Sequence, residues 1–417
     1  MFGILYLILL LLEVFVLTYL EYISWKTIYT PLTCLMLPYL LVLLISIAVA
    51  GHFGFVDFYY PSIGIWTVGL PLFAIPSYIL SLATIKYPQS FNKPITEEKY
   101  PKILGIISVI LSVAFILHFI RVIHSSIYLF GTDDFADDFA GHGLWAHLRE
   151  MVLPLLIIAI YFVKKRSWAL WCIITLLLTI QMLYLVKGAV IIAAVSGMCI
   201  RLYAGKMHLS TSLLLKVFLG SFAVFILAYM VIPLMGNENG EANMELFEFV
   251  IGHFFHYFTS GTLGFSYDME LHCGDMGDFE ILVAPFVNIY KTIVGDPNLI
   301  SPVNPLYLHT GINMTNVRTF FGTMYIYCNS FQFIAYTLIV STYFYSIKLL
   351  ALHSGNVFIY TILCYYCGLL AMGWFEFYLF HLSILEVPIM ILIFMAICKL
   401  ENSITNYRNE YTKKFDI

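Results

Sequence analysis

Charged side chains are scarce in this chain of 417 residues, in which Asp, Glu, Lys and Arg together make up 11%. A soluble protein of this length needs a far more polar surface, so the composition excludes a soluble globular domain. The sequence also lacks Walker, Rossmann, Gly-x-Ser-x-Gly and His-Glu-x-x-His patterns. Their absence argues against ATP-driven transport and against the common soluble hydrolases.

Apolar residues are abundant instead: the hydrophobic fraction is 61% and the mean hydropathy is +0.88. This composition predicts an all-α polytopic membrane protein. We expect about eleven transmembrane helices (range ten to thirteen) and one large external loop containing short helices. The expected spans cover residues 3–20, 33–50, 62–83, 102–123, 147–163, 167–186, 188–204, 213–235, 331–352, 357–378 and 384–400. A single integral-membrane domain would therefore contain spans one to eight (1–235), a periplasmic loop (236–330), spans nine to eleven (331–400) and a cytoplasmic tail (401–417).

Lys and Arg concentrate in the short loops on one side of these spans, which predicts that this side is cytoplasmic. Of the 21 basic residues, five fall on the other side: Arg121, Arg149, Lys187, Lys291 and Arg318. The large loop on that side is acidic and aromatic. A few cations among carboxylates near the membrane surface indicate a site for an anionic, lipid-linked substrate.

Three of these cations are the main site candidates. Arg149 lies where an external loop enters a span, and its forked guanidinium suits a phosphate, whereas snorkelling or pairing with Glu150 is the alternative. Lys187 and Gly188 form a tight external turn at membrane depth, with a headgroup-region turn as the alternative. Arg318 has neutral polar and aromatic neighbours that suit pyrophosphate or sugar recognition, and its alternative is an interfacial anchor.

The large loop carries two further patterns. Residues 244–258 predict an amphipathic helix, and Thr-Ser-Gly-Thr at 259–262 is expected to end it. His253 and His256 share a face of that helix, so either is a candidate general base, and a packed or interfacial histidine is the alternative. The His-x-x-His spacing brings no third ligand, so no metal is expected. Glu376 and Glu386 lie in or near spans, where each either pairs with a cation or serves as a base.

The layout and three stretches resemble the bacterial oligosaccharide repeat-unit polymerases, the Wzy-type O-antigen and capsule polymerases. The first stretch is the pair of spans around Lys187-Gly188, although many members of the family carry Arg at that position. The second, His-Tyr-Phe-Thr-Ser-Gly-Thr at 256–262, resembles the family's Tyr-x-x-x-Gly stretch. The third, Thr-Asn-Val-Arg-Thr-Phe-Phe-Gly at 315–322, resembles its Asn-Val-x-Thr-Phe segment.

The resemblance implies a metal-independent glycosyltransferase of the bacterial inner (cytoplasmic) membrane that needs no cofactor. Its donor and acceptor would be undecaprenyl-pyrophosphate-linked oligosaccharides, polymerised into O-antigen, capsule or exopolysaccharide on the periplasmic face. Besides these substrates and the lipid bilayer, a chain-length regulator is left open as a partner, and no nucleic acid is expected. The expected catalytic residues are Arg318, Arg149, Lys187 and His256, and the expected substrate-binding residues are His253, Tyr257, Lys291 and Asn316.

Two alternatives stay open. An O-antigen ligase of the same fold would pass the glycan to lipid A core. A flippase or transporter of lipid-linked saccharide would instead show pseudo-repeats and ionisable residues along its spans. The ionisable residues of this chain gather at the external face, which favours chemistry at the surface, although the sequence does not settle which residue is the base.

Overall fold

A computed structural model describes residues 2–91, 93–95, 99–126, 135, 138–139, 141, 143–183, 187–213, 215–216, 219–220, 222, 244–271, 278–301 and 303–415. Helices dominate this part of the chain, and its sheet is one antiparallel pair of two-residue strands. The chain divides into two compact units. Unit 1 comprises Met1–Lys86, Gly205–Tyr345 and Leu369–Leu382, and unit 2 comprises Tyr87–Ala204, Ser346–Gly368 and Ser383–Ile417.

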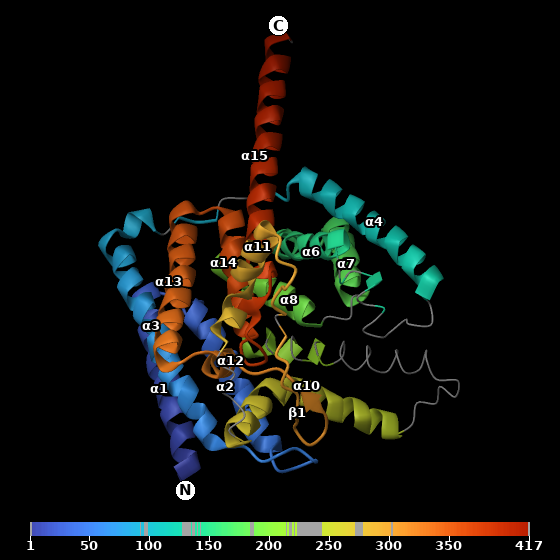
Figure 1. Ribbon diagram of the computed structural model, residues 1–417. Helices are drawn as coiled ribbons and strands as arrows, with labels where there is room; N and C mark the ends of the chain where they lie inside the picture. Colours follow the sequence, from blue (N-terminus) through green and yellow to red (C-terminus); the bar gives the residue numbers. More distant parts are fainter. Residues whose placement is uncertain are drawn as a thin grey trace. The chain divides into compact units, whose positions relative to one another are not determined.

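Figure 1 shows the helices and strands in the order of the chain. Unit 1 contains α1 (Phe2–Trp25), α2 (Pro31–Val49), η1 (Tyr60–Ser62), α3 (Ile63–Lys86), α10 (Met244–Leu271), η4 (Phe279–Val283), α11 (Ala284–Val294), β1 (Leu308–His309), β2 (Met314–Thr315), α12 (Phe320–Tyr327), η5 (Tyr378–Phe380) and most of α13 (Ser330–Ser354). Unit 2 contains η2 (Pro88–Ser90), α4 (Lys102–Ser126), α6 (Gly143–Phe162), α7 (Trp168–Leu183), α8 (Lys187–Tyr203), most of α14 (Val357–Ala371) and α15 (Ser383–Phe415).

Seven helices of the described part are long and apolar enough to cross a membrane: Gly3–Trp25, Pro31–Val49, Tyr60–Lys86, Lys102–Ser125, Gly143–Phe162, Ser330–Ser354 and Ser383–Thr405. Three shorter apolar helices are Trp168–Leu183, Gly188–Tyr203 and Val357–Ala371. The expected class, an all-α multi-pass membrane protein, is confirmed. All these helices coincide with expected spans, and the remaining expected span, 213–235, lies mostly outside the described residues.

Unit 1 is organised around Trp66 of α3. Its indole ring stacks on Tyr39 of α2 with 3.4 Å between ring centroids. Its Nε1 donates a hydrogen bond to Oγ1 of Thr319, the residue that caps the start of α12. Gly69, one turn further along α3, packs against the ring of Phe321, because a Cβ at this position would lie 2.7 Å from the ring carbons. These contacts fix α12 on α3 and thereby hold the chain that precedes α12.

In unit 2, α6 packs against α7, α8 and α15. Arg201 near the end of α8 donates from Nη1 to the carbonyl oxygens of Ile160 and Val163, both at 2.9 Å. Ile160 belongs to the last turn of α6 and Val163 follows the end of that helix, where carbonyl groups have no helical donor, so a cation is favourable there. The helix α6 begins at Gly143, whose φ of +59° is a conformation that favours glycine.

The expected end of a helix at residues 259–262 is wrong, because α10 continues without a break to Leu271. Thr259 and Ser260 turn their hydroxyl groups onto carbonyls of their own helix, those of Phe255 at 2.8 Å and Tyr257 at 3.1 Å. Gly261 lies against another backbone, since a Cβ there would lie 2.3 Å from the carbonyl oxygen of Phe375. The residues that indicated a turn are instead polar and small because they are packed closely inside the protein.

The span expected over 357–378 is too long, because α14 ends at Ala371. Beyond it the backbone turns, and the carbonyl of Gly373 accepts a hydrogen bond of 2.6 Å from the backbone N–H of Phe320. That N–H is one of the unpaired donors at the start of α12. The last helix, in contrast, is longer than the span expected over 384–400. Helix α15 continues through the expected cytoplasmic tail as far as Phe415 (Figure 1).

Candidate functional site

The first cluster of functional groups is built on one face of α10. Gly261, Gly264 and Asp268 are spaced by three and four residues, so they lie above one another on this helix. A Cβ at Gly264 would lie 3.0 Å from the carbonyl oxygen of Val317 and 3.3 Å from Nη1 of Arg318. Gly264 therefore lets the segment before α12 lie directly on the helix, with the carboxylate of Asp268 one turn beyond it, while Gly261 does the same for the backbone at Phe375.

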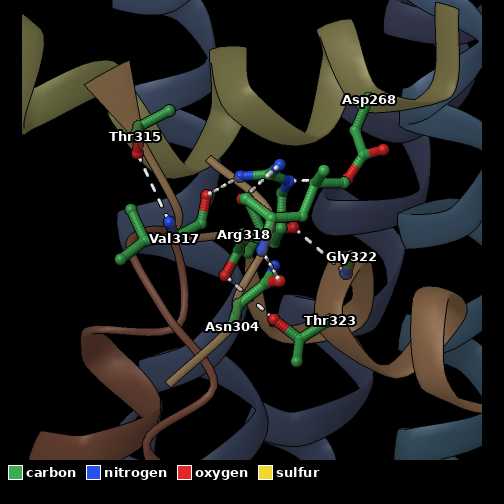
Figure 2. Close-up of polar contacts among 9 residues, drawn as sticks. Asp268, Asn304, Thr315, Val317, Arg318, Gly322 and Thr323 are labelled. Carbon is green, nitrogen blue, oxygen red and sulfur yellow. Dashed lines mark hydrogen bonds and ion pairs between the residues drawn. The ribbon is translucent and has the colours of Figure 1, made fainter. Parts of the chain in front are cut away.

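Arg318 and Asp268 form an ion pair on this face (Figure 2). Nε of Arg318 donates to Oδ2 of Asp268 at 2.7 Å, and the two side chains are 0% and 1% exposed. Nη1 also donates to the carbonyl of Val317 at 2.9 Å, and Nη2 lies 3.5 Å from the carbonyl of Leu306. An enclosed charge is tolerated only with such partners. In this conformation the guanidinium joins the helix to two stretches of the loop.

The loop around Arg318 is fixed by its own polar side chains, several of which Figure 2 shows. Oδ1 of Asn304 accepts from the backbone N–H of Leu306 at 2.9 Å and so closes a turn over Pro305. Asn316, expected to bind substrate, donates from Nδ2 to the carbonyl of Asn304 at 3.3 Å. Oγ1 of Thr323 donates to the carbonyl of Arg318 at 3.2 Å. Together these bonds hold the Arg318 backbone between α10 and α12.

The two histidines of α10 lie near the β-hairpin. His256 is 4% exposed, and its Nδ1 lies 3.5 Å from Oγ1 of Thr310, which follows β1. Burial, with a smaller contribution from the nearby His253 imidazole, lowers the pKa of His256 to about 4. His256 is therefore a neutral imidazole at pH 7. His253 is adjacent, with 6.0 Å between the two ring centroids and 5.0 Å to the ring of Tyr257.

His256 and Arg318, both expected to be catalytic, are held at different places along α10. His256 and Asp268 are twelve residues apart on the helix, which corresponds to a separation of about 18 Å along its axis. His256 contacts the hairpin, whereas Arg318 is bound at the other end by Asp268. The structure thus joins Arg318 with Asn316, and His256 with His253 and Tyr257, but it does not bring the two groups into one pocket.

Lys291, the remaining candidate of unit 1, lies in the last turn of α11. Its Nζ donates to the carbonyl of Asn298 at 2.8 Å. The helix ends at Val294 and is capped by Gly295, which has a φ of +78°, and Oδ1 of Asp296 then accepts from the backbone N–H of Asn298 in a turn. Hydrogen bonds from Asn298 lower the pKa of the Asp296 carboxyl group. The observed contact of Lys291 is thus with the turn that follows its own helix.

Arg149 and Lys187 belong to unit 2. Nη2 of Arg149 lies 2.6 Å from Oε1 of Glu150, and the carbonyl of Arg149 accepts from Nε2 of Gln181 at 3.2 Å. This is the pairing with Glu150 that the sequence offered as an alternative, and both side chains stay partly exposed. Lys187 is the first residue of α8, and its side chain lies outside the described part.

Three relationships could not be read from local patterns. No sequence pattern identifies the partner of Arg318, although the spacing of Asp268 from Gly261 and Gly264 indicates a common helix face. Glu386 is paired with His147, and Glu376 lies 3.9 Å from His381.

Among the described residues no group of three or more His, Cys, Asp or Glu side chains is arranged to hold a metal ion.

The long apolar helices of the two units define a multi-pass helical membrane protein. The chain belongs to the family of unknown function DUF6337, whose model matches residues 54–404 and thus more than half of the chain. No curated protein and no solved structure shows significant similarity to it.

Proposed function

We propose that the protein is an inner-membrane glycosyltransferase that polymerises undecaprenyl-pyrophosphate-linked oligosaccharide repeat units on the periplasmic face. About eleven spans would cross the membrane: the seven long helices, the three shorter ones, and one over 213–235. In this topology α10, α11, the hairpin and α12 lie outside the cytoplasm. The resemblance of residues 256–262 and 315–322 to the repeat-unit polymerases supports this assignment.

The observation that carries the proposal is the ordered segment between the apolar helices. Residues 244–271 and 278–327 form helices and a hairpin around the buried Arg318–Asp268 pair. Long loops inside compact domains are usually functional, and this loop buries an ion pair, which is energetically costly, to stay ordered. Both features support a function for the loop itself. Its exposed aromatic side chains, Tyr257, Tyr290 and Tyr307 among them, offer the flat apolar faces on which sugars stack.

The chemistry requires little beyond positioning and charge. A glycosyl diphosphate already carries its leaving group, so neither ATP nor a nucleotide is needed. A partly exposed cation stabilises the negative charge that develops on the departing diphosphate, and Arg149 is suited to this role because its side chain is partly exposed. Arg318 is enclosed, so its proposed contribution is to hold the outer segment in the shape that binds the glycan.

The test is to delete the gene in its host and separate the surface polysaccharide on a gel. A ladder that collapses to a single-repeat band, and returns with the wild-type gene, supports the polymerase. Arg149→Ala at equal expression should lower polymer yield about 100-fold or more, as for the loss of one transition-state donor. Arg166→Gln, which changes an exposed Arg at the other end of α6, is the matched control and should restore the ladder.

The other outcomes identify the alternatives. A ladder that persists on the lipid carrier but never reaches lipid A core would indicate a ligase. Single repeats retained on the cytoplasmic side would indicate a flippase. An unchanged polysaccharide profile would refute a role in glycan synthesis.

A further inference from the structure

A histidine and a glutamate meet where α6 and α15 begin. His147 is near the start of α6, and Glu386 is in the first turn of α15. Their side chains approach with 2.6 Å between Nδ1 of His147 and Oε1 of Glu386. The basic segment Lys164–Arg166 follows the other end of α6, so this pair lies at the end of unit 2 that the charge distribution places outside the cytoplasm.

The pair has the geometry of an oriented imidazole. An ionised carboxylate only accepts hydrogen bonds, so the proton of a neutral His147 lies on Nδ1 and the lone pair lies on Nε2. The His147 side chain is 55% exposed, whereas that of Glu386 is 19% exposed. The carboxylate is therefore sheltered behind a ring whose other edge is open to a reactant. This division of roles is the one that a general base and its orienting carboxylate require.

The surroundings supply the other charges that a transfer reaction needs. Glu150 lies three residues after His147, on the same face of α6, and is paired with Arg149. Tyr365 of α14 interacts electrostatically with both Glu150 and Glu386. On the side of α4, His118 stacks on Trp145 of α6 with 3.8 Å between ring centroids.

We propose that His147 is the general base that deprotonates the acceptor hydroxyl group, and that Glu386 is the residue that positions it; this rests on the proposed function. Nε2 of His147 takes the hydroxyl proton as the hydroxyl oxygen bonds to the anomeric carbon of the donor. The bond from that carbon to the diphosphate oxygen breaks, and its electron pair leaves with the polyprenyl diphosphate. His147 then releases the proton to water, so the products are the longer glycan, the diphosphate and one proton.

His147 is better suited to this step than His256, which is one of the candidate bases in the sequence. His256 is enclosed between α10 and the hairpin, and its pKa of about 4 makes it a weak base at neutral pH. His147 combines an open nitrogen with a carboxylate at hydrogen-bond distance. Glu150, which pairs with the proposed leaving-group cation Arg149, lies one turn after His147 on the same face of α6. Arg149 itself is two residues after His147 and therefore on a different face of the helix, so the base and the cation share this end of α6 and are linked through Glu150.

The experiment measures elongation by the purified full-length protein of the lipid-linked oligosaccharide extracted from the deletion strain, between pH 5 and 9. His147→Gln should lower kcat by about 100-fold to 10,000-fold, the usual contribution of a general base, with little change in KM. It should also abolish the fall in rate on the acidic side of the profile. Glu386→Gln should lower kcat by a smaller factor and leave KM unchanged, because it misorients a ring that is still present.

His381→Gln is the matched control, because His381 is also partly exposed but lies 3.9 Å from its glutamate, Glu376. It should keep the wild-type rate and pH profile. If the wild-type protein elongates the extracted lipid and His147→Gln does so at a similar rate with the same acidic limb, His147 is not the base while the glycosyltransferase stands. If the wild-type protein forms no product from that lipid, the proposed function fails and the role of His147 fails with it.

Discussion

Neutralising Asp268 should destabilise unit 1 more than almost any other single polar change, because the guanidinium of Arg318 would be left buried without its counter-charge. The two side chains are 0% and 1% exposed, so solvent does not screen the pair. With charge centres about 4 Å apart and an effective dielectric constant of about 20, their attraction is about 4 kcal/mol. Removal of one partner of a buried pair costs about 3 to 5 kcal/mol, which agrees with that value.

The measurement is the thermal unfolding of Asp268→Asn in detergent, followed by tryptophan fluorescence, which reports on the packing of Trp66. A loss of 3 to 5 kcal/mol corresponds to a fall in Tm of about 6 to 20 °C for a cooperative unit of this size. Asp296→Asn is the matched control, because Asp296 is exposed in the turn after α11 and the amide keeps an oxygen for Asn298. It should leave Tm unchanged.

A double variant distinguishes the cost of one unpaired buried charge from the cost of changing the packing at this position. In Asp268→Leu combined with Arg318→Met, both charges are replaced by apolar groups, and such replacements are often neutral or stabilising. Most of the Tm lost in Asp268→Asn should therefore return. If Asp268→Asn melts with the wild-type protein, or if the double variant is as unstable as the sum of its single changes, the buried pair is not what holds the loop on α10.

Three further changes test the packing of unit 1 by the same unfolding measurement. Gly261→Ala should lower Tm although alanine favours helices by about 1 kcal/mol, because its Cβ meets the Phe375 carbonyl; Gly252→Ala, with open space around it on the same helix, should raise Tm. His256 has a lower pKa in the folded protein, about 4, than in the unfolded chain, about 6.5, so unfolding takes up a proton between these pH values. The wild-type protein should therefore lose about 1 to 2 kcal/mol of stability between pH 7 and pH 5. His256→Phe should remove this pH dependence. Thr30→Ala should cost about 1 kcal/mol by removing the capping box of α2, and an unchanged Tm would contradict that assignment.

The positions of the spans follow from the sequence because long apolar stretches have few alternatives in a membrane. A backbone surrounded by lipid must satisfy its own hydrogen bonds, so each such stretch forms a helix whatever its neighbours are. The failure at residues 259–262 has the complementary cause. Thr, Ser and Gly signal a turn where water can solvate the backbone, but Gly261 lies under the Phe375 carbonyl and Thr259 bonds to its own helix. Only the packed structure supplies those partners.

The partners of the charged groups depend on contacts that no local pattern contains. Arg318 and Asp268 are 50 residues apart, and His147 and Glu386 are 239 residues apart. The sequence does indicate in each case that a partner is needed, because a carboxylate or guanidinium near an apolar helix is costly when unpaired. What packing adds is the difference in exposure. It encloses Arg318 and His256, which sequence reasoning placed at the centre of the chemistry, and it leaves His147 open beside a sheltered carboxylate. A group that must exchange a proton with a substrate has to be reachable, and a group that shapes a loop has to be enclosed. On that criterion we assign the proposed proton transfer to unit 2, and the proposed role of the Arg318 cluster is to keep the outer segment in shape.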